Sequence, residues 1–526
     1  MKASQADKGF MEKLLDGVEK AGNKVPHPVI IFLTLMVLVM VLSHVLYLTG
    51  ASVTQQMIDP QTEKLQTTTV TVRSLLSTEG IRFIYSSIIP SFMGFTAVGL
   101  IIVAMMGVGV AEEAGLIRAL IRKLVAVSPG WAIAYILVFI GIVSSLAADA
   151  GYLVLIPLAG TAFLSVGRNP LAGLAAGFAS VAGAFTVNML VKPLDAILTE
   201  FTNDAIHIVN PSLSIGLTAT LWFSIVSVIL LTFVITFVTQ RVVEPRLGAY
   251  AGGQPDPDAE GGDAEAGKSG ANDAEGVDAD HDSRGLRFAG IALAGALVVF
   301  GLLTLPSGAP LRNPDTGALI GNSPFMNGLI ALIMVLFLVT GAAYGFGART
   351  MKTSTDVIKA IEKAVAGLGS LIFLLFILSQ FISYFNYSNI GTIMAVKMAG
   401  VLQSANFPPL LLLLGFIVVV AIIDVLINGA IAKWALFAPI FVPLLMKLGV
   451  APEAVLAAYR VADSPINVIT PLNAYFALIV TFAQKYDKNA GVGTIVALML
   501  PYVLWISLIW IALFIAWQLL GLPWGL

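Results

Sequence analysis

The chain has 526 residues, of which 58% are hydrophobic and 11% are charged, and its formal net charge at pH 7 is -2. Ordinary soluble domains cannot bury so much apolar sequence, so the composition predicts a polytopic membrane protein. The net charge argues against a nucleic-acid partner, and the absence of cysteine excludes disulfides, thiolate metal sites and thiol catalysis.

Long apolar segments predict nine membrane-spanning helices. In chain order they lie near residues 28–50, 91–111, 170–203, 213–240, 288–306, 326–348, 367–386, 452–484 and 494–520. Lysine-rich residues 1–27 precede them, and the first apolar run is long enough to span, so we predict no cleavable signal.

Two further apolar stretches, residues 131–166 and 407–447, are interrupted near their middles. The interruptions carry polar and ionisable side chains, which are Ser144, Ser145 and Asp149 in the first and Asp424, Asn428 and Lys433 in the second. A half-length apolar run is too short to cross a bilayer, so each stretch is predicted to be a re-entrant hairpin whose tip lies inside the membrane.

The main clusters of basic residues fall on one side of the membrane if both hairpins re-enter, and the positive-inside rule makes that side the cytoplasm. The predicted units are a cytoplasmic N-terminus at 1–27, a first repeat at 28–240, a disordered acidic cytoplasmic linker at 241–287 and a second repeat at 288–526.

Prolines and alanines recur at matching places in the two halves. The matched prolines are Pro157 with Pro439 and Pro170 with Pro452, and the sequence PLDA at 193–196 matches PLNA at 471–474. An inverted repeat with paired hairpins and broken helices is the plan of secondary transporters, whose sites lie near the membrane midplane. We therefore predict an all-α polytopic membrane protein with about nine transmembrane helices, two re-entrant helical hairpins in an inverted repeat, and broken helices at 170–203 and 452–484.

Polar residues and prolines interrupt both predicted broken helices, at 187–193 and 463–471. A proline leaves a carbonyl oxygen free, and such an oxygen persists at membrane depth only where protein, water or an ion satisfies it. Neutral side-chain oxygens that suit a sodium ion or a substrate amide come from Ser144, Ser145, Asn188, Asn428, Thr470 and Asn473.

Arg460 and Asp463 lie three residues apart, on one helix face and within reach of each other. One interpretation is a structural ion pair that holds the broken helix. The other is that Arg460 binds an anionic group while Asp463 takes part in ion or proton coupling. Asp195 either caps a restarted helix or lines the site, and Asp149 has the same two interpretations.

Trp434 follows the second tip and is either an interfacial anchor or a stacking wall for an aromatic substrate. Its neighbour Lys433 is expected to pair with Asp424 or Asp463, or to snorkel towards the interface. We expect Asp463, with Asp424 in support, to carry a coupling proton, because desolvation and nearby cations act in opposite directions on a carboxyl group.

Four segments resemble the AbgT family of p-aminobenzoyl-glutamate transporters: SSLAADAGYLVLIPLAG, KPLDA, IAKWALFAPIFVPLLMKLG and AAYRVADSPINVITPLNAYF. The resemblance covers nearly the whole chain. It implies a homodimer of elevator-type protomers in a bacterial inner membrane, which carry p-aminobenzoyl-glutamate or export sulfonamide antimetabolites. The positions that match the family's functional pattern are Asp195, Trp434, Pro452, Arg460, Asp463 and Pro471.

Two positions depart from the family pattern. This chain has Asp424 where the resemblance leads us to expect asparagine, and Ile431 where we expect a small hydroxyl residue. An ion ligand at the second tip is therefore lost, or is replaced by a carboxylate that can itself carry a proton.

The predicted function is secondary active transport of p-aminobenzoyl-glutamate or a related aromatic anion, including export of sulfonamide antimetabolites, driven by a proton or sodium gradient. The pattern GxxxxGK[ST] occurs at residues 262–269, GDAEAGKS, within the predicted acidic linker and not between a predicted strand and helix, so ATP-driven pumping is not expected, and neither is enzymatic activity. The alternatives are sodium-coupled dicarboxylate uptake and, from another class, a membrane-embedded hydrolase that uses Asp149 with Asp195 or Asp463 as paired acids.

The predicted substrate-binding residues are Asn188, Asp195, Trp434, Pro452, Arg460, Pro471 and Asn473. The predicted ion-coupling residues are Ser144, Ser145, Asp149, Asp424, Asn428, Asp463 and Asn467. No cofactor is expected apart from a bound sodium ion if sodium is the coupling ion, and the four scattered histidines lack the spacing of metal ligands.

Overall fold

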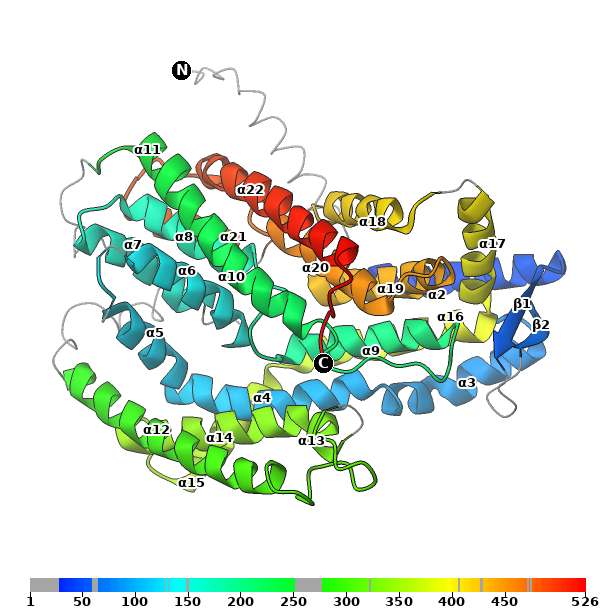
Figure 1. Ribbon diagram of the computed structural model, residues 1–526, viewed down its shortest axis with the longest axis horizontal. Helices are drawn as coiled ribbons and strands as arrows, with labels where there is room; N and C mark the ends of the chain where they lie inside the picture. Colours follow the sequence, from blue (N-terminus) through cyan, green and yellow to red (C-terminus); the bar gives the residue numbers. More distant parts are fainter. Residues whose placement is uncertain are drawn as a thin grey trace, which may run out of the picture.

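A computed structural model describes residues 28–58, 65–126, 128–130, 132–147, 151–250, 277–320, 323–404, 407–425, 429–470, 473 and 475–526. Nearly all regular structure in these residues is helical (Figure 1), which confirms the predicted all-α polytopic fold class. Three predicted site residues, Asp149, Asn428 and Pro471, lie outside the described residues.

Eight helices in the described residues are long and apolar enough to cross a membrane. All but one correspond to predicted spans, and these are α2 (Pro28–Leu48), α3 with α4 (Thr78–Met93 and Thr96–Ala114), α10 (Leu221–Val238), α12 (Val277–Thr304), α14 (Leu329–Ala348), α16 (Gly369–Ser388) and α22 (Val492–Leu519). The remaining one is α19 (Ala430–Lys447), an arm of the second hairpin. Helices that are apolar on all sides suit lipid, because lipid offers no partner to a polar face.

The two other predicted spans are broken helices. The first consists of α8 (Pro170–Ala182) and α9 (Pro193–His207), and the second of α20 (Pro452–Ile466) and α21 (Phe476–Gln484). A proline starts α8, α9 and α20, where its missing N–H costs nothing. The sequence therefore encodes both the break and the restart.

The first hairpin consists of α6 (Ile133–Val143), a 3-10 turn η1 (Ser144–Ala147), a π-helix η2 (Gly151–Leu155) and α7 (Ile156–Ser165). The second consists of α18 (Pro409–Asp424) and α19. At about 1.5 Å per residue, α6, α7 and α18 are shorter than a hydrocarbon core of roughly 30 Å, as expected for re-entrant arms. Helix α7 packs along α8 but α19 packs along α9, so the second hairpin lies against the first broken helix.

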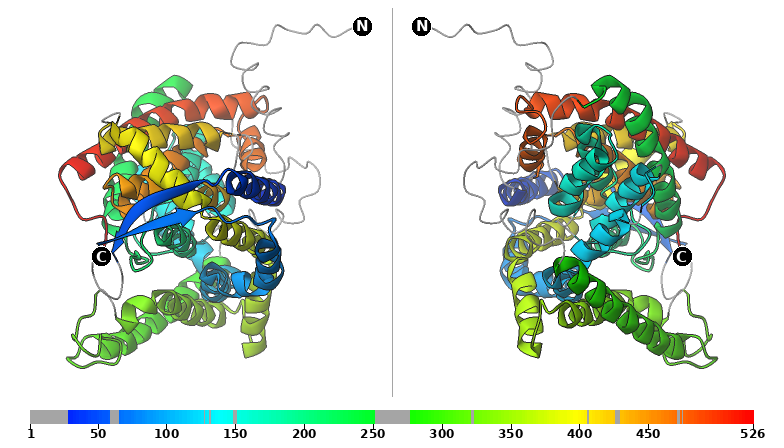
Figure 2. Two further views of the ribbon diagram at one scale, coloured as in Figure 1. Left: turned by 90° about the vertical axis from the view of Figure 1, so that its right-hand side faces the viewer. Right: turned by 90° about the vertical axis from the view of Figure 1, so that its left-hand side faces the viewer.

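Helices α4, α14 and α12 form a layer at one edge of the molecule (Figures 1 and 2). Two glycines permit this close packing. A Cβ atom at Gly107 would lie 2.2 Å from the carbonyl oxygen of Met334, and one at Gly341 would lie 2.6 Å from the Cα atom of Ala111. Small residues let transmembrane helices approach closely in this way.

The shorter described elements are β1 (Ser52–Ile58), β2 (Leu65–Thr71), α5 (Leu116–Ala126), η3 (Thr239–Val243), α11 (Glu244–Leu247), α13 (Pro324–Asn327), α15 (Ser354–Ala366) and α17 (Ile390–Ser404). The strands pair antiparallel, from Ser52 opposite Thr71 to Ile58 opposite Leu65.

The predicted disordered linker, 241–287, is helical at both described ends. Helix α11 follows α10 and η3, and α12 begins at Val277. Asp282 accepts hydrogen bonds from Arg122 of α5, at 2.5 and 3.1 Å, and from the Tyr344 hydroxyl of α14, at 2.6 Å. These partners stabilise the polar first turns of α12, and composition alone could not reveal them. Residues 251–276 lie outside the described residues.

Candidate substrate and ion site

The two breaks meet because the first break is hydrogen-bonded to helix α20. The Thr186 amide donates to the Ser464 hydroxyl at 3.0 Å, and the Thr186 hydroxyl donates to the Arg460 carbonyl oxygen at 3.1 Å. The two hydroxyl oxygens lie 2.5 Å apart. Since the Thr186 hydroxyl donates to a carbonyl, the Ser464 hydroxyl must donate to Thr186.

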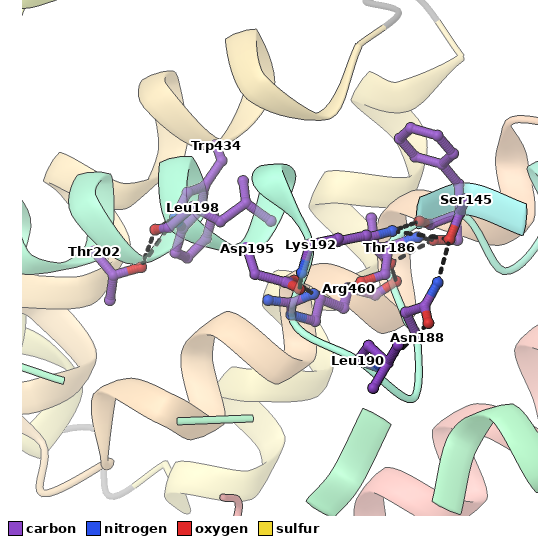
Figure 3. Close-up of polar contacts among 12 residues, drawn as sticks. Ser145, Thr186, Asn188, Leu190, Lys192, Asp195, Leu198, Thr202, Trp434 and Arg460 are labelled. Carbon is purple, nitrogen blue, oxygen red and sulfur yellow. Dashed lines mark hydrogen bonds and ion pairs between the residues drawn. The ribbon is translucent and has the colours of Figure 1, made fainter. Parts of the chain in front are cut away.

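Arg460 joins the two halves of the chain. Its side chain is 2% exposed, and its Nη1 atom donates to the Asp195 carboxylate at 2.7 Å and to the Thr186 carbonyl oxygen (Figure 3). Its Nε atom is buried and has no hydrogen-bond acceptor among the described residues. The interpretation of an ion pair between Arg460 and Asp463 is wrong, because Arg460 pairs with Asp195 of the other half and Asp463 pairs with Lys433.

Asp195 also caps α9, which is one of its two predicted interpretations. One carboxylate oxygen accepts the Lys192 backbone amide at 2.9 Å, and the other accepts Arg460. A carboxylate near a helix N-terminus is stabilised by the orphan amides there.

Lys192 is a site residue that the sequence analysis did not select. Its Nζ atom donates to the Ser145 hydroxyl at 3.2 Å and to the Phe185 carbonyl oxygen, and the side chain is 1% exposed. Asn188 donates to the same Ser145 hydroxyl at 3.1 Å and to the Val143 carbonyl oxygen at 2.9 Å. The sequence signal that could have identified Lys192 is a lysine within an otherwise apolar segment.

We call Lys192, Asp195 and Arg460 the first cluster. Their formal charges sum to +1. Ser145 of the first hairpin lies beside this cluster, whereas the Ser144 hydroxyl donates to the Gly141 carbonyl oxygen at 2.7 Å within its own hairpin.

We call Asp424, Lys433 and Asp463 the second cluster. Lys433 forms ion pairs with Asp424 and, at 2.7 Å, with Asp463, and all three side chains are fully buried. Asn467 donates to Asp463 at 3.4 Å, and the Tyr459 hydroxyl lies 2.9 Å from Asp463 and 2.5 Å from the Ala430 carbonyl oxygen. The formal charges of this cluster sum to -1.

Trp434 does not form an open stacking wall in this conformation. It is fully buried, and its Nε1 atom donates to the Leu198 carbonyl oxygen at 3.0 Å and the Thr202 hydroxyl at 3.1 Å (Figure 3). Its ring centroid lies 4.6 Å from that of Tyr459. The indole therefore fastens the second hairpin to α9, because its polar edge is satisfied there and its faces are packed.

Pro452 and Asn473 lie apart from Arg460. Pro452 starts α20, and eight residues of helix place it about 12 Å along the axis from Arg460. Asn473 donates to the Asn467 carbonyl oxygen at 3.1 Å and accepts the Tyr475 amide at 3.0 Å, so it orders the second break. Of the predicted substrate residues, Arg460 and Asp195 thus form an ion pair, whereas Asn473 forms hydrogen bonds within the second break.

Paired hairpins and two broken helices that bring buried charges together are typical of membrane transporters. The model of the AbgT putative transporter family matches residues 13–526. The chain belongs to the AbgT family, and the resemblance drawn from the sequence is confirmed.

Three individual relatives are similar to this protein over nearly the whole chain. The p-aminobenzoyl-glutamate transport protein of Escherichia coli (strain K12) is 32% identical over 515 residues, which are 98% of this chain and 96% of that protein. The structure of the Alcanivorax borkumensis YdaH transporter has 39% identity and a TM-score of 0.85, covering 95% of this chain and 100% of the other. Neisseria gonorrhoeae MtrF, described within a class of antimetabolite efflux pumps, has 36% identity and a TM-score of 0.87, covering 96% and 97%.

Proposed function

We propose that the protein is a secondary active transporter of p-aminobenzoyl-glutamate or related aromatic carboxylates, including sulfonamide antimetabolites, and that a proton or sodium gradient drives it. The name of the Escherichia coli relative supports the first substrate, and the description of MtrF supports efflux of antimetabolites. The proposal includes a homodimer in a bacterial inner membrane with a cytoplasmic N-terminus. The basic clusters of the sequence support that orientation.

The observation that carries the proposal is the half-satisfied guanidinium of Arg460. Its Nε edge is buried without an acceptor, and the first cluster around it has a formal charge of +1. A substrate carboxylate at this edge would neutralise the cluster and accept the remaining N–H groups in the planar geometry that arginine favours.

Movement of the second hairpin is part of the proposed cycle. Trp434 can reach a substrate only when α19 separates from α9, because in the present conformation both hydrogen bonds of the indole go to α9. We propose that the hairpins and broken helices move as a unit against the layer of α4, α14 and α12. This motion would open the Arg460 site to one side of the membrane and then to the other.

The test is counterflow of labelled p-aminobenzoyl-glutamate in proteoliposomes. Arg460→Ala should abolish counterflow, and Arg460→Lys should restore little, because an ammonium cannot reproduce the planar fork. Arg241, an exposed arginine of η3, supplies the control, and Arg241→Ala should behave as the unchanged protein.

The same vesicles separate transport from hydrolysis. Chromatography of the vesicle contents should return p-aminobenzoyl-glutamate intact. Release of p-aminobenzoate and glutamate would favour the membrane-embedded hydrolase. Sodium-driven uptake of aliphatic dicarboxylates, without counterflow of p-aminobenzoyl-glutamate, would favour the sodium-coupled dicarboxylate transporter.

A further inference from the structure

Asp424 is the more weakly stabilised carboxylate of the second cluster. In the described part of the chain its polar partner is Lys433, and no other donor reaches either oxygen. It also lies at the C-terminal end of α18, where the free carbonyl groups of the helix make the surroundings negative. Both features disfavour a negative charge on Asp424.

Asp463 has the better environment for a negative charge. It is paired with Lys433 at 2.7 Å and Asn467 donates to it at 3.4 Å, while the Tyr459 hydroxyl lies at 2.9 Å and shares its one proton between Asp463 and the Ala430 carbonyl oxygen. Hydrogen bonds to the charged form of a carboxyl group stabilise that form. If one of the two carboxyl groups holds a proton, the contacts assign it to Asp424.

The charge balance of the second cluster requires such a proton. Asp424, Lys433 and Asp463 are each 0% exposed, and two carboxylates with one ammonium leave a buried charge of -1. An uncompensated charge at membrane depth costs about 2.5–3.5 kcal/mol even on the lowest scales. One proton makes the cluster neutral.

Lys433 already occupies the place of a cation between the two carboxyl groups. A sodium ion at this point would have to displace an ammonium that is covalently held by the chain. A proton needs no such space, because it adds to an oxygen that accepts few hydrogen bonds.

We propose that Asp424 is a proton-binding site, and that its proton is the coupling ion while Asp463 and Lys433 remain an ion pair. This inference rests on the transport function proposed above. The helices packed on α18 are α19 and α20, and the titratable or charged groups they direct towards the cluster are Lys433, Tyr459, Asp463 and Arg460. Arg460 is engaged by Asp195, so it does not serve as the counter-ion of Asp424.

The test is Asp424→Asn, which keeps the size of the side chain and removes the proton. Proteoliposomes with a trapped pH dye and labelled p-aminobenzoyl-glutamate report proton movement and substrate counterflow together. The unchanged protein should move protons with substrate and accumulate substrate under an imposed pH gradient. In Asp424→Asn, counterflow should persist but become independent of pH, and both proton movement and gradient-driven accumulation should be lost. Glu113→Gln, which alters a half-exposed partner of Lys363, is the control and should keep coupling.

The proposal would be overturned if Asp424→Asn moved as many protons per substrate molecule as the unchanged protein. It would also be overturned if sodium drove substrate accumulation in the unchanged protein without proton movement. If Asp424→Asn does not fold, Asp424→Glu should keep coupling and shift the infrared band of the protonated carboxyl group, and an unshifted band would overturn the proposal. If the unchanged protein shows no counterflow, the proposed function fails. The infrared band and its loss in Asp424→Asn then still test the proton site.

Discussion

The first and second clusters are both buried ion-pair groups beside the helix breaks, but they carry opposite formal charge. At the first break, Lys192, Asp195 and Arg460 sum to +1 and leave the Arg460 Nε edge without an acceptor. At the second break, both carboxyl groups surround one ammonium and no side chain is exposed. Helix α20 contributes a residue to each cluster, Arg460 to the positive one and Asp463 to the negative one, so neighbouring positions on one helix take part in clusters of opposite charge.

The largest expected effect is on the free energy of unfolding, when the lysine of each cluster is replaced. Lys433→Met leaves two buried carboxyl groups without a cation and should destabilise the protein by about 3–5 kcal/mol. Lys192→Met leaves the Asp195–Arg460 pair intact and should fold normally. Thermal unfolding of both variants in detergent is the measurement. Equal melting temperatures would remove the contrast between the clusters.

The next effect concerns substrate affinity. Lys192→Met reduces the first cluster from +1 to zero, so the dissociation constant for p-aminobenzoyl-glutamate should rise on the order of tenfold, as for a unit charge at moderate distance. Titration calorimetry measures the change. Arg241→Ala is the matched control, since it removes a positive charge far from the breaks in sequence and on an exposed turn. An unchanged affinity would show that Lys192 has a structural role.

Trp434 offers a smaller test of how the clusters are held together. Trp434→Phe loses two hydrogen bonds to α9 and should cost about 1–2 kcal/mol of stability, whereas Thr202→Val loses one of the two. If Trp434 also contacts substrate in the opened state, Phe should keep most of the binding and Ala should lose on the order of 1 kcal/mol or more. Equal substrate affinity in the unchanged protein, Trp434→Phe and Trp434→Ala would exclude the stacking role.

Much of this arrangement could be predicted from the sequence, because the membrane makes charges and breaks conspicuous. The broken helices, the hairpins and the presence of Arg460 and Asp463 within the membrane-embedded part followed from polar residues in apolar sequence. The Arg460–Asp195 ion pair did not follow from the sequence, since Arg460 and Asp463 share a helix face, whereas the pairing of Lys433 with Asp424 or Asp463 was expected.

The sequence could not show that Trp434 is fully buried or that Lys192 belongs to the first cluster. An indole beside a hairpin tip has the same sequence signature whether its N–H faces a substrate or a carbonyl oxygen. Lys192 next to Pro193 resembles a simple interruption until Ser145 of a distant hairpin is placed against it.

The smallest effect should come from the acidic segment between the halves. Replacing residues 251–276 with a short Gly/Ser segment should leave counterflow unchanged, since the composition of this segment offers nothing to bury. Extending the deletion through Asp282 should reduce stability, because Arg122 and Tyr344 then lose their partner. Loss of transport in the shorter deletion, with a normal melting temperature, would assign the segment a gating or binding role.

The most direct measurement of the central claim is a structure of the protein with p-aminobenzoyl-glutamate bound. We expect a substrate carboxylate within hydrogen-bonding distance of Arg460 Nε, with Lys433 still between Asp424 and Asp463. A substrate carboxylate on Lys433, or a metal cation in place of its ammonium, would contradict the division into an anion site and a proton site.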